Sequence, residues 1–260
     1  MKAGFLNFTI VANPEHVKKI FASSKTLTSQ PSTIFALKHL FATPKHVISF
    51  YEADDSGMAS VPRKKSRTAQ QDRIHFHQAR ASQKFLAGEH MQHLASQYFG
   101  TLERNLEAVG LQEETWAEFP DLFAFLQDHV SRSAIESIMG SKILELNPDL
   151  IENFWTFDNN VPLFLRCIPR LFMPRAYRAR DRILASIKKW HAYGNKHSDC
   201  SKIGPDDPEW EPYFGAKLIR ARQNYMLKMK RMDADSIASE DLGLMFAYVA
   251  RPTPVDDHIN

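Results

Sequence analysis

Four histidines lie close together in the sequence and are the first candidates for chemistry. They are His75, His77, His90 and His93. Imidazole nitrogens bind zinc, copper or iron, and on a helix His90 and His93, three residues apart, would share a face. His75 and His77 would not share a helical face, and the chain has no His-Glu-x-x-His pattern. The spacing therefore favours solvated or capping histidines over a metal site, and we assign no metal ligand.

The two cysteines, Cys167 and Cys200, are the candidate nucleophiles. They are too few for a disulfide scaffold or a four-cysteine metal site, and they point to a reducing compartment. A reactive thiol needs a base and a polarising environment. Residues 163–169 around Cys167 are apolar, which predicts burial, whereas residues 197–201 around Cys200 predict a polar loop. Neither spacing identifies a nucleophile, and we assign no catalytic residue.

Two basic groups are candidates for binding an acidic partner. The basic run at residues 63–67 could bind phosphate or act as a nuclear localisation signal. Such runs more often form solvated loops. The second group shares one face of a helix predicted over 214–232, and its members are Lys217, Arg220, Lys228 and Arg231. A basic amphipathic helix can lie on an acidic membrane or partner. The more common arrangement is a half-buried helix with a charged exterior.

The composition is that of an ordinary globular protein. Of 260 residues, 43% are apolar and 24% are charged, which argues against disorder, collagen and a coiled coil. The net charge of +3 is too small to make nucleic acid an expected partner. No window approaches about 20 consecutive apolar residues, so we expect no transmembrane helix, and the N-terminus does not resemble a signal peptide. Glycine-rich phosphate loops, nucleophile elbows and dinucleotide fingerprints are absent from the sequence.

The elements that would position these residues are predicted to be mainly helical, with one or two short N-terminal strands. Residues 8–12 predict a strand, and Asn13 followed by Pro14 has the cap and first residue of a helix. Next come a short helix, an extended segment and a long loop, predicted at 33–41, 46–51 and 52–72. Helices with apolar faces are predicted over 91–106, 119–138, 174–190, 214–232 and 236–250.

One domain over residues 1–260 is the simplest organisation, because neither repeats nor low-complexity linkers divide the chain. Pro252 and Pro254 cannot continue a helix, so residues 251–260 are expected to form a frayed tail.

The order of these segments resembles the N-terminal half of a cytochrome P-450. Residues 10–21 resemble the first-sheet strand and helix B, 72–80 and 85–88 resemble helix C, and 241–247 resemble the start of helix I. Residues 157–190 resemble the region of helices F and G. Within this family, the sequence most resembles the fungal branch that is similar to sterol 7α-hydroxylases and prostacyclin synthases. The resemblance implies a partial P-450-like fold from about helix B to the start of helix I.

The resemblance also implies a chemistry and its partners. Members of this family are heme-thiolate monooxygenases, whose cysteine thiolate favours O–O cleavage at the iron. A lipophilic substrate such as a terpenoid, steroid or other secondary metabolite is implied, with NADPH-cytochrome reductase as electron donor and an endoplasmic-reticulum membrane as location. The family pattern W-x-x-x-R, which reaches the heme propionates, matches Phe76 and Arg80. Arginine suits a carboxylate, whereas Phe76 lacks the indole donor.

Two decisive family motifs do not occur in these residues. No Glu is followed three positions later by Arg, and neither cysteine fits the axial loop F-x-x-G-x-x-x-C. Leu163 and Lys196 stand where that loop needs glycine. The resemblance therefore predicts a truncated chain that is inactive as it stands, in which heme binding is doubtful and exposed faces reduce stability. The alternative is a non-catalytic helical interaction module acting through 214–232 or 52–72.

Overall fold

The computed structural model describes residues 2–3, 6–7, 9, 11–23, 29–110, 116–201 and 203–249. These residues are mainly helical, as predicted, and they form twelve α-helices. The first part contains β1 (Lys2–Ala3), β2 (Leu6–Asn7), α1 (Pro14–Ala22), α2 (Gln30–His39), α3 (Lys45–Ala53), α4 (Ile74–Phe85), α5 (Gly88–Glu107) and α6 (Leu122–Met139). The second contains α7 (Ser141–Leu146), α8 (Leu150–Asp158), α9 (Val161–Leu165), α10 (Pro174–His197), β3 (Trp210–Glu211), β4 (Gly215–Ala216), α11 (Lys217–Met226) and α12 (Ala234–Val249). The predicted tail at 251–260 lies outside the described residues.

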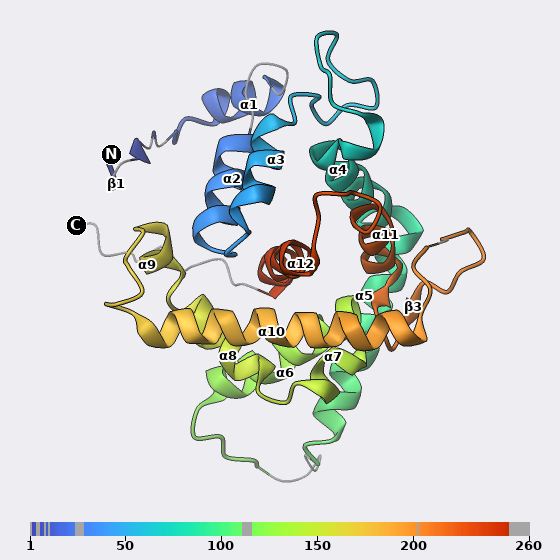
Figure 1. The fold of residues 1–260 in the computed structure, drawn as a ribbon. Coiled ribbons are helices and arrows are strands. Elements are labelled where there is room, and N and C mark those ends of the chain that lie inside the picture. The colour runs from blue at the N-terminus through green and yellow to red at the C-terminus, as the bar shows by residue number, and fades with distance from the viewer. Residues whose placement is uncertain are drawn as a thin grey trace.

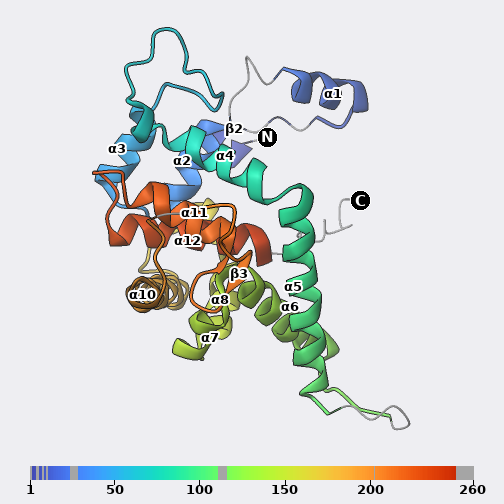
Figure 2. The same ribbon diagram turned by 90° about the vertical axis from the view of Figure 1, so that its right-hand side faces the viewer.

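Helix α10 is the longest of the described helices (Figure 1). It packs against α7 and α8 on one side and against α12 on the other. Residues three or four apart share a helix face, and the stripe formed by Ile183, Ile187 and Trp190 is accordingly fully buried. Figure 2 shows α5 and α6 lying side by side as a second long pair. No helix among the described residues combines the length and apolarity needed to cross a membrane.

Two glycines permit a close backbone approach between the start of α7 and the small sheet formed by β3 and β4. Gly140 has a φ of 88° and Gly215 a φ of 62°, in the region that favours glycine. A Cβ atom at Gly140 would lie 2.4 Å from the carbonyl oxygen of Pro212, and one at Gly215 would lie 2.3 Å from the Gly140 nitrogen. Larger residues at either position would push β4 away from α6.

The N-terminal predictions are partly confirmed. The side chain of Asn13 caps α1 by accepting hydrogen bonds from the backbone nitrogens of Glu15 at 2.9 Å and His16 at 3.3 Å. Short N-terminal strands are present, since β1 pairs antiparallel with β2. The strand predicted over 8–12 is wrong where described, because Thr9, Val11 and Ala12 are irregular. A strand needs a partner for its backbone groups, and it is residues 6–7 that find one.

The prediction of an extended segment over 46–51 is wrong, since these residues lie in α3. The buried side chains Val47, Phe50 and Tyr51 have helical spacing, and burial of this face outweighs the strand preference of the Val47-Ile48 pair. The helix predicted over 214–232 is also too long. Helix α11 ends at Met226, where hydrogen bonds between residues three apart close the last turn. The short α7, α8 and α9 were not predicted by periodicity alone.

The loop between α3 and α4 is organised around Arg73, a fully buried arginine. Its guanidinium donates to Ser56 Oγ at 3.1 Å, to the Ser60 carbonyl at 2.9 Å and to Gln70 Oε1 at 3.1 Å. It also donates to the backbone carbonyl of Ala59. A guanidinium has five N–H donors in a fixed planar arrangement. One side chain can therefore donate hydrogen bonds to several carbonyls of a loop that lacks the regular hydrogen bonds of a sheet.

We expect Arg73→Met to lower the free energy of unfolding by about 3 kcal/mol, because the buried Ser56 hydroxyl and two carbonyls of the loop lose their donor together. Urea unfolding followed by circular dichroism measures this change. The control is Arg67→Met in the exposed part of the same loop, which should change stability by less than about 0.5 kcal/mol. Equal effects of the two substitutions would contradict the role assigned to Arg73.

Candidate functional site

The two residues matched to the heme-propionate pattern lie on one face of α4. Phe76 is half-buried and Arg80, one turn further on, is exposed. Arg80 does not stack on Phe76; the guanidinium carbon of Arg73 lies over the Phe76 ring, 4.4 Å from its centroid. The structure therefore brings Phe76 and Arg80 to the same face and leaves the Arg80 charge facing solvent.

A groove of about 750 Å³ runs beside this helix. It is lined by α4 residues including Gln78 and Ser82, by Met58 and Arg63 of the preceding loop, and by Thr33 of α2. The basic run at 63–67 forms part of the exposed surface around it. The groove joins the loop predicted over 52–72 to the helix that carries Phe76 and Arg80.

The four histidines do not form a site. The ring of His75 lies 3.2 Å from a backbone carbonyl of α3, and that of His77 lies 3.0 Å from a carbonyl of the turn preceding α4. His90 Nδ1 lies 2.6 Å from a carboxylate oxygen of Glu209, and His93 is exposed. Across the part of the chain that the structure describes, no three His, Cys, Asp or Glu side chains gather as a metal-binding group.

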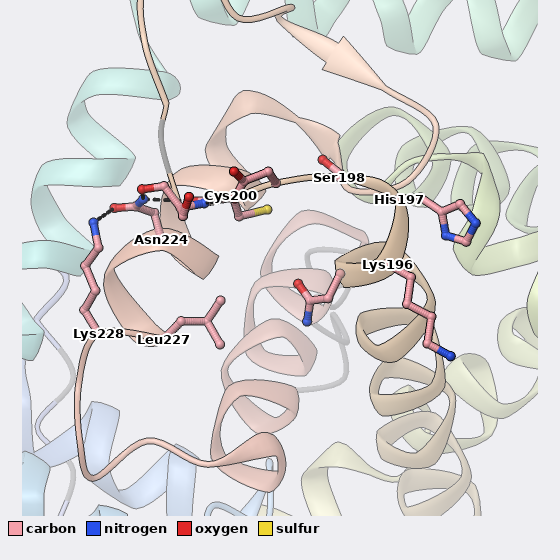
Figure 3. Close-up of a pocket in the computed structure, with 10 residues that line it drawn as sticks. Lys196, His197, Ser198, Cys200, Asn224, Leu227 and Lys228 are labelled. Carbon is pink, nitrogen blue, oxygen red and sulfur yellow. Dashed lines mark hydrogen bonds between the residues drawn. The ribbon is translucent and has the colours of Figure 1, made fainter.

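The loop predicted around Cys200 is present after α10, but the exposure of the two thiols differs from what their neighbours indicate. Cys167 is exposed at the end of the five-residue surface helix α9, so its apolar neighbours do not bury it. Cys200 is buried, and burial, followed by the charge of Glu211, raises its pKa to about 12. Cys200 lines a pocket whose volume is about 510 Å³. Figure 3 shows it there with Asn224 and Lys228. A thiol in this state is protonated at neutral pH and is a poor nucleophile.

The basic face predicted for 214–232 is wrong. Lys217 and Arg220 are buried, and Lys228 and Arg231 lie beyond the end of α11. Lys217 Nζ donates to two backbone carbonyls of the loop 203–209, at 3.2 and 2.9 Å, and contacts a carboxylate of that loop at 3.1 Å. Arg220 donates to another carbonyl there. These charges hold a loop in place, which removes the basis for an acidic partner on this helix.

A buried charge network surrounds the middle of α12 and was not predicted. Arg222 of α11 donates to Glu240 Oε2 and Asp241 Oδ1, both at 3.3 Å. His191 Nε2 of α10 lies 2.8 Å from Asp241 Oδ2, and Gln223 donates to the same oxygen at 2.9 Å. All five side chains are buried. The network therefore joins three helices through charge-assisted hydrogen bonds in a site shielded from water.

The second carboxylate extends the network to the N-terminal helices. Tyr51 of α3 donates its hydroxyl to Glu240 Oε1, and Gln78 of α4 donates to Glu240 Oε2 at 2.6 Å. Burial, reinforced by the Glu240 charge, raises the pKa of Tyr51 well above its usual value, so its hydroxyl stays a donor. Gln78 also lines the groove beside α4, which connects that groove to the buried network.

Asp241 is ionised in this setting. Burial alone would raise the pKa of Asp241, but the His191 hydrogen bond and the Arg222 charge outweigh it and lower the pKa below its usual value. Local sequence patterns did not predict this, because Arg222 and the Glu240-Asp241 pair look like ordinary exposed charges until their partners are known. A charge inside an otherwise apolar helical stripe is the one signal that could have pointed to them.

Comparison with known proteins places the chain in a family. It is 30% identical over 249 residues to the cytochrome P-450 monooxygenase efuG of Hormonema carpetanum, covering 94% of this chain and 41% of that protein. It is 35% identical over 176 residues to the P-450 monooxygenase fsoE of Humicola fuscoatra, covering 67% of this chain and 30% of that protein. The P-450 monooxygenase calL of Penicillium decumbens is 21% identical over 249 residues, covering 95% of this chain and 45% of that protein.

The chain belongs to the cytochrome P-450 family, which confirms the resemblance stated above. It spans less than half the length of each of these curated relatives. No family model and no solved structure matches the chain.

The lowered pKa of Asp241 predicts a specific dependence of stability on pH. Its stabilisation is complete above the ordinary Asp pKa of about 3.9 and is lost as pH falls through the lower folded-state value. We expect Asp241→Asn to cost about 3 kcal/mol at pH 7, and the difference from the unaltered protein to shrink below pH 4. Urea unfolding across this range measures it. Asp235→Asn, at an exposed position of the same helix, is the control; a pH-independent cost at Asp241 would contradict the argument.

Proposed function

We propose that this chain forms part of a heme-thiolate monooxygenase that hydroxylates a lipophilic substrate, and that these residues alone are inactive. The observation that carries the proposal is 30% identity over 249 residues to a P-450 monooxygenase. A terpenoid, a steroid or another secondary metabolite is the proposed substrate class, and NADPH-cytochrome reductase is the proposed electron donor. The mainly helical order from α1 to α12 supports the same assignment.

The residues present fit one part of a heme site and not the other. An exposed arginine at position 80 can pair with a propionate, and half-buried Phe76 offers an apolar edge. The iron ligand of this family is a cysteine thiolate. Neither Cys167 nor Cys200 lies in an axial loop motif, and Cys200 is buried as a thiol. The chain by itself therefore lacks the ligand through which heme chemistry would run.

An exposed apolar stripe supports the view that residues 1–260 belong to a single larger P-450-like domain. On α6, Leu122 is 57% exposed, Phe123 53%, Leu126 45% and Val130 42%. Four large apolar side chains on one helix face normally mark a contact surface. Because the relatives are more than twice as long as the matched region, we propose that this stripe packs against residues of that larger domain.

The proposed inactivity predicts what the absorption spectrum of the chain mixed with heme should lack. Purified chain mixed with heme and reduced under carbon monoxide should show no thiolate-type Soret band, because no axial thiolate loop is present. A complete P-450 monooxygenase treated in the same way is the positive control. A thiolate-type band that disappears in Cys167→Ser or Cys200→Ser would contradict the proposal.

Arg80 predicts a measurable contribution to heme affinity. If its guanidinium pairs with a propionate at the surface, Arg80→Gln should weaken heme binding about fivefold, since a solvent-exposed ion pair contributes up to about 1 kcal/mol. Quenching of tryptophan fluorescence during heme titration measures the Kd. Arg67→Gln is the matched control. Equal Kd values for Arg80→Gln and the unaltered chain would contradict the assignment.

A further inference from the structure

Cys167 and His39 form an exposed thiol–imidazole pair between two helices that are far apart in sequence. The sulfur of Cys167 lies 3.6 Å from Nδ1 of His39, within hydrogen-bond distance for a thiol. Cys167 is exposed and His39 is half-buried. The pair exists because α9 packs against α2, which brings the end of one helix to the end of the other (Figure 1).

Both side chains are held in place by their backbones. Cys167 has a φ of 56°, a conformation that few residues other than glycine adopt, and its nitrogen donates to the Phe164 carbonyl at 2.9 Å to close α9. Arg180 donates to the carbonyl of His39 at 3.1 Å, and the Phe35 ring lies 4.5 Å from the His39 ring. The backbones that carry the thiol and the imidazole are therefore held in place, with the two side chains within reach of each other.

The surroundings favour a neutral imidazole and an anionic reagent. Burial and the adjacent Lys38 charge lower the pKa of His39, so its ring is uncharged at neutral pH and can accept a proton. The charged groups around His39 are Lys38, Glu52 in the same groove, and Arg180 from α10. Arg166, which precedes Cys167, adds another exposed positive charge. An exposed sulfur beside a base and basic residues is the arrangement of a reactive thiol.

We propose that Cys167 is a thiol-modification site at which His39 acts as the base, with small anionic disulfides such as glutathione disulfide as the reagent class. As the sulfur attacks one sulfur of the disulfide, its proton passes to His39 Nδ1. A new S–S bond forms between Cys167 and one half of the reagent while the original S–S bond breaks. The leaving thiolate takes up a proton, which yields a mixed disulfide and one free thiol. Nothing in this proposal requires heme.

The test measures the reaction of glutathione disulfide with each cysteine by peptide mass spectrometry. At pH 7, His39→Gln should slow modification of Cys167 about tenfold or more, because the base is lost. At about pH 10 the two rates should converge, because hydroxide in the solvent then takes over the role of the base. His93→Gln, at an exposed position of α5, is the matched control. Cys200 is the internal measure of folding, because it is buried and should react only in unfolded protein.

A second measurement needs no variant. In the unaltered protein at pH 7, Cys167 should react at least fivefold faster than N-acetylcysteine in the same solution, because general-base assistance is available only in the protein. A Cys167 rate equal to or below that of the free thiol would overturn the proposal. So would an unchanged rate in folded His39→Gln protein. If the His39→Gln protein unfolds, as shown by modification of Cys200, the comparison of Cys167 with N-acetylcysteine in the unaltered protein decides whether the proposal holds.

Discussion

The buried guanidinium of Arg222 is the constraint on which the packing of α12 depends. A buried positive charge is destabilising unless it is paired and hydrogen-bonded, and Arg222 finds its partners in Glu240 and Asp241. The same two carboxylates bind Tyr51 of α3 and His191 of α10. Helix α12 can therefore occupy only the position in which all these groups are satisfied at once, and α3, α10 and α11 are placed around it.

This arrangement links the family assignment to the physical structure. The segment that resembles the start of helix I begins at Asp241, so the network holds the helix that carries this segment. Gln78 connects the network to α4, the helix that carries Phe76 and Arg80. The helix that carries the residues proposed for the heme edge is thus linked to the helix resembling helix I by a half-buried polar contact, although the axial thiolate loop is not among these residues.

Local patterns predicted local structure and failed where distant partners decide. The cap at Asn13 and the apolar stripe of α10 follow from residues close in sequence, so both were predictable. Burial of Lys217 depends on carbonyls of the loop 203–209, which no helical periodicity indicates. Cys167 is exposed despite its apolar neighbours, and Cys200 is buried within a loop of polar residues, so neighbouring polarity does not set the exposure of either thiol. The propionate residues Phe76 and Arg80 came from resemblance and remain a prediction.

Hydrogen exchange of the α12 backbone tests the central claim most directly. If the network holds α12, the backbone amides of α12 in the unaltered protein exchange only through large-scale opening. Arg222→Met should then accelerate their exchange at least about 100-fold. This factor corresponds to the roughly 3 kcal/mol or more expected when a buried charge loses its partner. Lys228→Met, which removes an exposed charge just beyond α11, should leave these amides unchanged. Equal exchange of α12 in Arg222→Met and the unaltered protein would contradict the claim that Arg222 anchors this helix.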